Sequence, residues 1–380
     1  MNRVLTGTYF EMGNWTCAEG ALAAGCSFCA AYPITPASEI ANRLARRLPE
    51  VGGVFIQMED EIGAVCAAIG ASWAGKKAMT VTSGPGISLM QENIGYAAST
   101  EAPLVIVDVQ RLGPSTGVPS VGVAGDMVQV ARGSHGDYQI IALAPESPQE
   151  MFDLTIHAFN LAERYRVPVF VMADAFVGHM RERVRIPDEK EIKIWNRKVA
   201  SKAGSVLERR DFLDIDVAPM PVFGLGLKAH VTGSCHDEHG MRNLSDPEVM
   251  HRYVMNPIKK IITKIKDITM VEDLSENSPV VLLSYGSVAR SAKATAVLAR
   301  QRGMKLGVFR LITCWPFPEE EIVKLSQRCD EIVVLENNSG QMYPYIRAVA
   351  ASNCRVRFIE PEIIGQIHSP EYILSKLGSF

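Results

Sequence analysis

The chain has 380 residues, and its apolar share of 47% and charged share of 21% are those of a globular protein with two or three domains. A formal net charge of −3 gives no basic field for nucleic acid, and no apolar run is long enough to span a bilayer. The N-terminus has neither a continuous apolar stretch nor a small-residue cleavage site, so we expect a cytoplasmic protein without membrane contact.

Strand and helix patterns alternate over the first half of the chain. The sequence predicts a short strand that ends near Tyr32, a helix over 37–51 capped near Ser38, a strand over 53–60 and a helix over 61–75. A strand and a Gly/Pro turn over 76–86, a helix over 87–100 and an apolar strand that begins at Pro103 follow, and the alternation continues over 140–176. Apolar strands between helices indicate a parallel sheet covered on both faces.

A second alternating block begins near Pro279, after a stretch over 183–256 with scattered charges and no clear period. We therefore expect an α/β protein with two doubly wound, mostly parallel-sheet domains. The first would cover residues 1–256, with 183–256 as a long irregular excursion, and the second, smaller one would cover 257–380.

Four polar loops follow predicted strands of the first domain: the loop at Thr35, then 59–61, 83–86 and 111–117. Because ligands of such sheets bind at the carboxyl ends of the strands, these loops should meet at one edge. Thr35 lies between Pro33-Ile34 and Pro36, and the two prolines restrict the backbone around it. A hydroxyl in so stiff a loop should have a defined partner.

Glu61 opens a helix rich in Ala and Gly, in the stretch MEDEIGA. Acidic residues in a first helical turn are favoured by the helix dipole, which is sufficient for Glu59 and Asp60. The small residues after Glu61 would also let a flat ligand approach closely. Arg111, beyond a buried strand, is either a bidentate partner for a carboxylate or a surface charge.

The Gly- and Cys-containing motifs are less specific. The turn that contains Gly84-Pro85 resembles a phosphate cradle but lacks the spacing and lysine of a P-loop. Cys26 and Cys29 form a single C-x-x-C, and the other cysteines are scattered. We expect small buried thiols rather than a redox pair or a metal site.

Taken together, these stretches resemble the alpha subunit of 2-oxoacid:ferredoxin oxidoreductases, most closely the 2-oxoglutarate (2-oxoglutarate synthase) branch. The resemblance covers nearly the whole chain, and its motifs are AAYPITPASEI, MEDEIGA, TSGPGISLMQENIGYA, QRLGPSTGVPS, HGDY, GHMRE, VTGSCHDEHG, YGSVAR, WPFP and ENNSGQM. It implies a thiamine pyrimidine-binding domain followed by a transketolase C-terminal-like domain.

The resemblance also implies roles for individual residues. Glu61 would hydrogen-bond the thiamine pyrimidine N1′ and so favour the tautomer that deprotonates the thiazolium C2. Arg111 would pair with the substrate C1 carboxylate, and Thr35 would donate a hydrogen bond to the 2-oxoacid. The cofactor-binding wall would be formed by Glu61 together with Pro33, Ile34, Gly84 and Pro85.

The chain has neither the Gly-Asp-Gly segment that holds the diphosphate and Mg²⁺ nor a ferredoxin-type cysteine run. The resemblance implies that thiamine diphosphate is shared with a beta subunit. Mg²⁺ and [4Fe-4S] clusters would reside on that and other partners, with gamma and ferredoxin-like delta subunits, ferredoxin and CoA completing the system. No metal ligands are expected in this chain. One departure from the family is Ala124 where a glutamine is common.

Three alternatives stay open: a branched-chain (2-oxoisovalerate) oxidoreductase subunit, a non-catalytic scaffold that docks redox subunits, and a nucleotide-binding module. The last is disfavoured because no G-x-G-x-x-G follows a strand. A 2-oxoglutarate enzyme needs a second cation or several donors for the distal carboxylate. Arg132 and His135 are candidates, but the sequence slightly favours the alternative that both are solvated surface residues on a helix and a loop.

Overall fold

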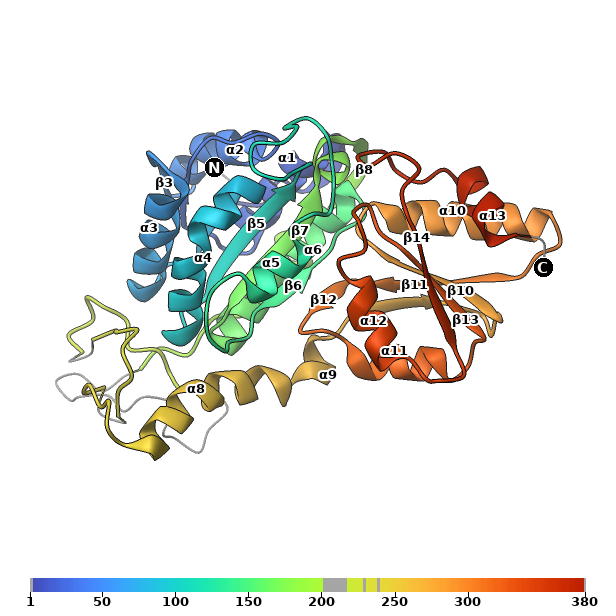
Figure 1. Cartoon of the computed structure of the whole chain (residues 1–380). Coiled ribbons are helices and arrows are strands. Elements are labelled where there is room, and N and C mark those ends of the chain that lie inside the picture. The colour runs from blue at the N-terminus through green and yellow to red at the C-terminus, as the bar shows by residue number, and fades with distance from the viewer. Residues whose placement is uncertain (1–2, 201–216, 228–229, 238–239, 379–380) are drawn as a thin grey trace.

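The first domain is built on a seven-stranded sheet (Figure 1). The computed structural model of the chain describes residues 3–200, 217–227, 230–237 and 240–378. Within these residues the strand order is β12-β6-β7-β5-β4-β2-β3, and all neighbours are parallel except β12, which runs antiparallel to β6. The strands are β2 (Phe28–Ala31), β3 (Val54–Gln57), β4 (Ala78–Thr82), β5 (Leu104–Gln110), β6 (Ile141–Leu143), β7 (Pro168–Asp174) and β12 (Thr313–Trp315).

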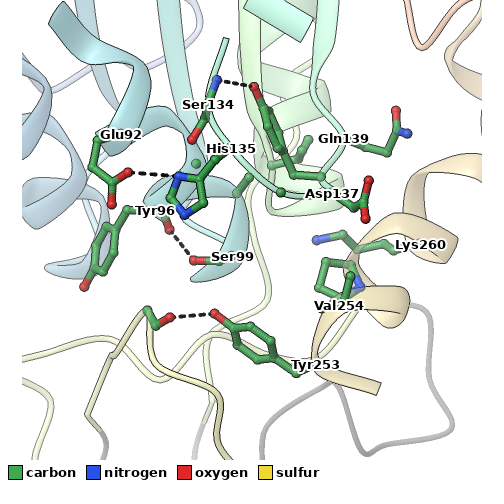
Figure 2. A pocket seen from close by; sticks show the side chains of 17 residues that line it. Glu92, Tyr96, Ser99, Ser134, His135, Asp137, Gln139, Tyr253, Val254 and Lys260 are labelled. Carbon is green, nitrogen blue, oxygen red and sulfur yellow. Dashed lines mark hydrogen bonds and ion pairs between the residues drawn. The ribbon is translucent and has the colours of Figure 1, made fainter. Parts of the chain in front are cut away.

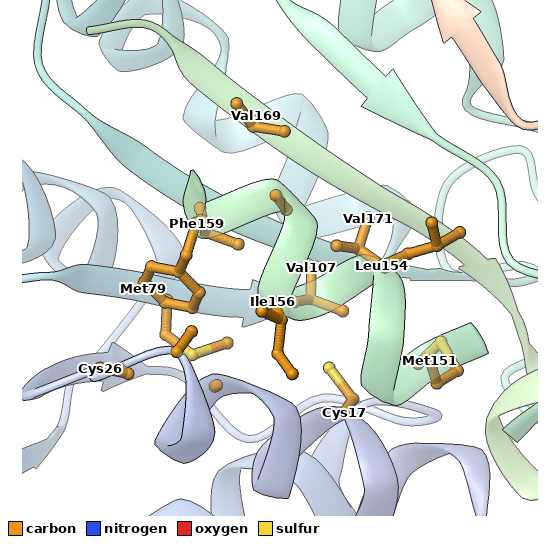
Figure 3. Close-up of a cluster of buried hydrophobic side chains, with 14 of the residues drawn as sticks. Cys17, Cys26, Met79, Val107, Met151, Leu154, Ile156, Phe159, Val169 and Val171 are labelled. Atoms are coloured by element: carbon orange, nitrogen blue, oxygen red, sulfur yellow. The ribbon is translucent and has the colours of Figure 1, made fainter. Parts of the chain in front are cut away.

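Helices cover both faces of this sheet, as the apolar strands predicted. In β5, Val105 and Val107 face one core cluster, while Leu104 and Ile106 face the other. The first cluster includes Cys17 and is shown in Figure 3. Its helices are α1 (Gly13–Ala23), α2 (Ser38–Glu50), α6 (Pro148–Tyr165) and α7 (Ala175–His179), and those of the opposite face are α3 (Glu61–Trp73), α4 (Gly84–Ser99) and α5 (Met127–Arg132).

Six of the eight cysteines are buried thiols, while Cys66 is exposed and Cys235 is partly exposed. Cys26 and Cys29 are both fully buried, and all eight cysteines of the chain are free. Burial raises the pKa of Cys26 to about 12 and that of Cys29 well above the usual thiol range. The C-x-x-C pair is therefore core packing, as the scattered cysteine pattern indicated.

The second domain has a five-stranded sheet of order β14-β13-β10-β11-β9, parallel apart from the edge strand β9. Its strands are β9 (Val271–Leu274), β10 (Val280–Tyr285), β11 (Leu306–Leu311), β13 (Glu331–Leu335) and β14 (Arg355–Ile359). One face is covered by α10 (Val288–Gln301) and α13 (Pro370–Leu377), and the other by α11 (Glu319–Ser326) and α12 (Tyr343–Val349). The core under α11 and α12 is continuous with the core under α3 and α4.

The stretch expected to be irregular over 183–256 has regular structure at both ends. Strand β8 (Arg181–Ile186) pairs with β1 (Gly7–Met12), a contact between distant segments that local periodicity cannot reveal. The short turn η1 (Glu189–Glu191) and the helices α8 (Pro247–Ile262) and α9 (Ile265–Ile268) follow, so the proposed boundary at 256 and 257 falls inside α8. Residues 201–216, 228–229 and 238–239 lie outside the described part, and residues 238 and 239 belong to the VTGSCHDEHG motif.

Two helix starts also differ from expectation. Helix α4 begins at Gly84, so the Gly/Pro segment forms its first turn instead of a turn before it. Helix α2 has Ala37 at its N-cap, and the Ser38 side chain makes no capping hydrogen bond. No helix in the described part of the chain is long and apolar enough to cross a membrane.

A buried ion network joins the two domains. Arg310 of β11 is 1% exposed, and its Nη1 lies 2.8 Å from Glu150 and 3.0 Å from Glu146, both at the start of α6. Glu272 of β9 lies 3.4 Å from the same nitrogen. Lys293 of α10 bridges Glu146 and Glu272 at 2.6 Å each. Because one buried cation holds carboxylates from both sheets, the relative position of the domains depends on it.

Replacing Arg310 by Met should therefore lower the free energy of unfolding by about 2–4 kcal/mol, because three partly buried carboxylates lose their shared cation. Arg300→Met is the matched control, since Arg300 and Glu276 form an exposed pair of 71% and 64% side-chain exposure. Its loss should cost about 0–1 kcal/mol. Urea unfolding of both variants measures the difference, and equal effects would mean that the network does not stabilise the junction.

Candidate active site

Three polar loops from separate parts of the chain meet at one edge of the seven-stranded sheet. Thr35 follows β2, Gly84 opens α4 after β4, and Arg111 follows β5. The winding of the sheet reverses between β2 and β4, because β3 lies on one side of this pair and β5 on the other. Ligands of open α/β sheets bind at such a point. The loops are in contact there, since Arg111 Nη1 donates a 2.7 Å hydrogen bond to the main-chain carbonyl of Thr35.

Glu61 is the buried member of the acidic triplet. It is the first residue of α3 and 4% exposed, whereas Glu59 and Asp60 are exposed. Asp60 caps the helix by accepting a 2.7 Å hydrogen bond from the Gly63 N–H. Burial raises the pKa of Glu61, as does Asp60, while its own N–H and Arg111 oppose the shift. The helix dipole and the cap thus account for Asp60, but they do not account for the burial of Glu61.

The Glu61 side chain fits because residue 86 is glycine. A β-carbon at Gly86 would lie 2.0 Å from Thr82 Oγ1 and 2.7 Å from Glu61 Oε1. The small residues of α3 have a different use from the one expected: Ala64 and Ala68 are fully buried against the sheet. The close approach that positions the carboxylate is thus made by α4, and not by the alanines of α3.

Arg111 is a nearly buried cation between two acids. It is 7% exposed, and burial lowers its pKa, while Asp126 and Glu61 act in the opposite direction. Its Nε has no hydrogen-bond partner in the described part of the chain. A buried guanidinium with an open N–H can accept a carboxylate ligand.

Both domains line the cleft beside Arg111, which has a volume of about 580 Å³. The first domain contributes the start of α4 and the loops around Ser115 and Asp126, and the second contributes Asn338 and Gln341. Asn338 Nδ2 donates to the Ala124 carbonyl at 2.6 Å, and Gln341 Nε2 donates to the Gly125 carbonyl. The ENNSGQM segment therefore holds the loop in which the family glutamine is replaced by Ala124.

The pattern search missed two acids of this site, Asp108 and Asp126. Asp108 lies near the end of the otherwise apolar strand β5 and is fully buried. Burial and Asp126 raise the pKa of Asp108 well above the usual range, and burial raises the pKa of Asp126 to about 6 against the opposing effects of Asp108 and Arg111. The sequence did contain a signal for Asp108. An acid within the mostly apolar strand LVIVDVQ is expected to be buried, and a buried acid needs a partner.

The other predicted wall residues follow β2 and β4. Pro33 and Thr35 are exposed and Ile34 is partly buried in the loop after β2. Pro85 lies in the first turn of α4 and lines the cleft with Gly84. The atom of Thr35 with a defined partner is its carbonyl, because the hydroxyl makes no hydrogen bond within the described residues.

Arg132 and His135 do not reach this cleft. His135 lines a separate pocket of about 410 Å³ beside the second half of α4, and its Nδ1 lies 3.5 Å from Glu92 (Figure 2). Its side chain is 88% exposed. Arg132, at the end of α5, is also exposed and does not line the cleft. The structure thus places both side chains on the exposed surface and away from the cleft beside Arg111, which agrees with the solvated-surface alternative.

Exposed apolar side chains of β3, α3 and α4 lie near the candidate site, and we call them the apolar surface. Ile62 and Cys66 are exposed on α3, and Leu89 is 49% exposed on the neighbouring helix α4. Val54 and Ile56 are 49% and 40% exposed on β3, the edge strand of the sheet. Exposed apolar residues on and beside an edge strand are typical of a protein–protein interface.

Comparison with known proteins identifies the family. Residues 19–256 match the family model for "Pyruvate flavodoxin/ferredoxin oxidoreductase, thiamine diP-bdg", and residues 278–373 match that for "Pyruvate:ferredoxin oxidoreductase core domain II". The chain belongs to this oxidoreductase family. The expected resemblance and the two-domain α/β fold class are thereby confirmed, and thiamine diphosphate binding is part of the family description.

Individual relatives agree with this family assignment. A 2-oxoglutarate synthase subunit KorA from Methanothermobacter thermautotrophicus is 49% identical over 98% of this chain and 99% of its own length. A ketoisovalerate oxidoreductase subunit VorB from the same organism is 36% identical over 92% of this chain and 91% of its own length. A solved 2-oxoglutarate:ferredoxin oxidoreductase from Magnetococcus marinus, with 2-oxoglutarate, coenzyme A and succinyl-CoA bound, has a TM-score of 0.88 and 32% identity. The similarity covers 98% of this chain and 65% of that one.

The glycine beside Glu61 gives a test of the site geometry. Gly86→Ala should lower the free energy of unfolding by about 1–3 kcal/mol, because its methyl group overlaps Glu61 and Thr82. Gly70→Ala on α3 is the control, since nothing lies within 4 Å of its β-carbon position. It should stabilise the helix by about 0.5–1 kcal/mol. Urea unfolding of the purified chain measures both, and a neutral Gly86→Ala would contradict the close approach.

Proposed function

We propose that this chain is the catalytic alpha subunit of a thiamine diphosphate-dependent, CoA-acylating 2-oxoglutarate:ferredoxin oxidoreductase. In this reaction 2-oxoglutarate loses CO₂, the remaining acyl group is joined to CoA as succinyl-CoA, and a pair of electrons passes singly through iron–sulfur clusters to ferredoxin. The reaction is reversible. The observation that carries the proposal is the buried carboxylate of Glu61 beside Arg111 at the reversal point of the sheet.

The residues present fit the pyrimidine half of thiamine diphosphate. Glu61 is a buried carboxylate that accepts no hydrogen bond from another side chain in the described residues, so it can accept one from a ligand. The orphan Nε of Arg111 likewise leaves a donor for a ligand carboxylate. When bound, thiamine diphosphate supplies the electron sink for decarboxylation.

Each side chain then has a distinct task. Glu61 would hydrogen-bond the pyrimidine N1′, and because burial raises its pKa, this carboxyl would share or exchange a proton with that nitrogen more readily than an exposed carboxylate would. Arg111 binds the C1 carboxylate of the 2-oxoacid, and the Thr35 hydroxyl donates to the substrate. Pro33, Ile34, Gly84 and Pro85 form the wall against which the cofactor lies.

The diphosphate half of the site belongs to a partner in this proposal. No group of three or more His, Cys, Asp or Glu in the described part of the chain is placed to hold a metal ion. A beta subunit would supply Mg²⁺ ligands and a [4Fe-4S] cluster, with gamma and ferredoxin-like delta subunits beyond it. The similar proteins are themselves named as subunits. The apolar surface of β3, α3 and α4 is suited to contact with such a partner.

Substrate choice rests on the polarity of the cleft. Ser115 and Ser339 line it, and their hydroxyls are potential donors for a distal carboxylate, whereas the Ser88 hydroxyl already donates to the Gly84 carbonyl. A branched-chain 2-oxoacid would gain nothing from these groups. The higher identity to the 2-oxoglutarate synthase subunit than to the ketoisovalerate subunit supports the same choice.

Purification of the complex from native cells tests the proposal as a whole. We expect CoA-dependent viologen reduction with 2-oxoglutarate at a higher kcat/KM than with 2-oxoisovalerate, together with bound thiamine and cluster absorbance. The chain expressed alone should be colourless and inactive, because it lacks the diphosphate and cluster ligands. A preference for 2-oxoisovalerate would assign the chain to the branched-chain enzymes, and activity of the pure chain would refute the shared site.

Glu61→Gln should reduce turnover of the complex by about two to four orders of magnitude, because the amide cannot hold a proton as the carboxylate does. Assembly and folding should be unchanged, since the side-chain volume is retained. Viologen reduction measures the loss, and thiamine quantified in each preparation separates lost binding from lost turnover.

Glu59→Gln and Asp60→Asn are the controls, because both side chains are exposed and Asp60 acts as the helix cap. Each should change stability by about 0.3–1 kcal/mol and leave turnover near normal. Normal turnover in Glu61→Gln would favour the docking-scaffold alternative. A larger loss at Glu59 would place the carboxylate on another residue.

A further inference from the structure

Asp108 is a buried acid to which the proposed reaction assigns no task. It is fully buried in β5, where it pairs in register with Thr82 of β4 and Met172 of β7. Neither oxygen of its carboxyl group meets an N–H or O–H donor in the described part of the chain. An ionised carboxylate without donors in such a place would be strongly unfavourable.

The acid beside Asp108 is Asp126, whose N–H donates to Gln110, two residues further along β5, and whose carboxyl lies against Gly84, two residues after Thr82. Each of the two carboxyl groups shifts the pKa of the other, and a hydrogen bond between them would satisfy the buried Asp108. Two carboxyl groups can form this bond only if one of them holds a proton, which makes Asp108 the donor. The direction of the shifts agrees: contact with Asp126 raises the pKa of Asp108, while the hydrogen bond from Asp108 lowers that of Asp126. The pair therefore carries one proton and one negative charge.

Asp126 is held in place by contacts that do not depend on its charge. Its N–H donates a 3.0 Å hydrogen bond to Gln110 Oε1. Its carboxyl lies against Gly84, where a β-carbon would approach Oδ2 to 3.1 Å. Asn338 and Gln341 of the second domain hold the carbonyls of the two preceding residues. Its negative charge is thus available to the neighbouring cation.

That cation is Arg111, whose pKa is lowered by burial and raised in opposition by the charges of both Asp126 and Glu61. With the Asp108–Asp126 pair at a single negative charge, Arg111 keeps its attraction for an incoming carboxylate. With the pair fully ionised, an additional buried anion would oppose the binding of an anionic substrate.

We propose that Asp108 is a protonated carboxylic acid and a positioning residue, whose hydrogen bond to Asp126 limits the pair to one negative charge and so keeps Arg111 able to bind the C1 carboxylate of the 2-oxoacid. This inference rests on the proposed role of Arg111. It predicts that substrate affinity falls when the pair loses its proton.

The shared proton can be tested without any activity. The folded chain binds this proton more tightly than the unfolded chain, so the free energy of unfolding should fall as the pH rises past the ordinary aspartate range and through the raised values. Urea unfolding of the full chain from about pH 5 to about pH 8 measures this slope. Asp108→Asn should make it shallower, because the amide donates the same hydrogen bond without titrating. An unchanged slope would overturn the shared proton.

The effect on Arg111 is tested in the purified complex. KM for 2-oxoglutarate should rise with pH by up to about tenfold per unit above the pair's upper pKa, while kcat changes little. Asp108→Asn and Asp126→Asn should both remove this rise, because each leaves a single carboxyl group. Having two variants guards against the failure of one to fold.

Asp174→Asn is the matched control. Asp174 is also a buried acid at a strand end with a raised pKa, but its partners are Ser287 and the Val177 N–H. This variant should keep the rise of KM with pH. A wild-type KM that does not depend on pH, or a rise that persists in both pair variants, would overturn the proposal. Absence of any 2-oxoacid-dependent reduction would instead refute the proposed function, while the unfolding slope would still report the shared proton.

Discussion

The burial of one cation, Arg111, is the constraint on which the candidate site depends. A guanidinium that is 7% exposed must be compensated, and its compensation comes from three separate segments: the Thr35 carbonyl, Glu61 and Asp126. These segments follow β2, open α3 and precede α5. The direct hydrogen bond ties the loop of Thr35 to that of Arg111, and the charges of Glu61 and Asp126 favour the charged form of Arg111. The Thr35 and Arg111 loops are therefore joined before any ligand binds, which reduces the ordering that a ligand would otherwise have to impose.

The second domain takes part in this arrangement through main-chain contacts. Asn338 and Gln341 bind the carbonyls of 124 and 125, so the loop that carries Asp126 is held from the other sheet. The position of that sheet depends in turn on Arg310 and on the continuous core below α11 and α12. The charge environment of Arg111 therefore depends on the packing between domains as well as on its immediate neighbours.

Local patterns were sufficient for most of the strand and helix order and for the reversal-point loops, because each depends on periodicity or on residues adjacent in sequence. The role of Glu61 came from the family resemblance and stays a prediction. Local patterns failed where distant segments meet: the pairing of β8 with β1 and the separation of His135 from the cleft depend on tertiary contacts. Helix α8 did have local signals, a capping Asp246 followed by a proline, within the stretch expected to be irregular. Asp108 could have been recognised from the sequence, because an acid in an apolar strand requires a partner. Its partner Asp126 could not, because it comes from a loop whose position the sequence does not define.

The same electrostatic reasoning bears on why such a site would be divided between chains. In the proposed assembly a partner covers the apolar surface near Glu61 and Arg111, and water is removed from around these two side chains. Removal of water lowers the effective dielectric and strengthens each charge–charge interaction there. An excess negative charge that water screens in the isolated chain would then oppose substrate binding more strongly. Holding the acids to one net charge is consequently of greatest value in the assembled state, because the loss of substrate affinity once the pair ionises should be larger in the complex than the same charge would cause in the solvated isolated chain.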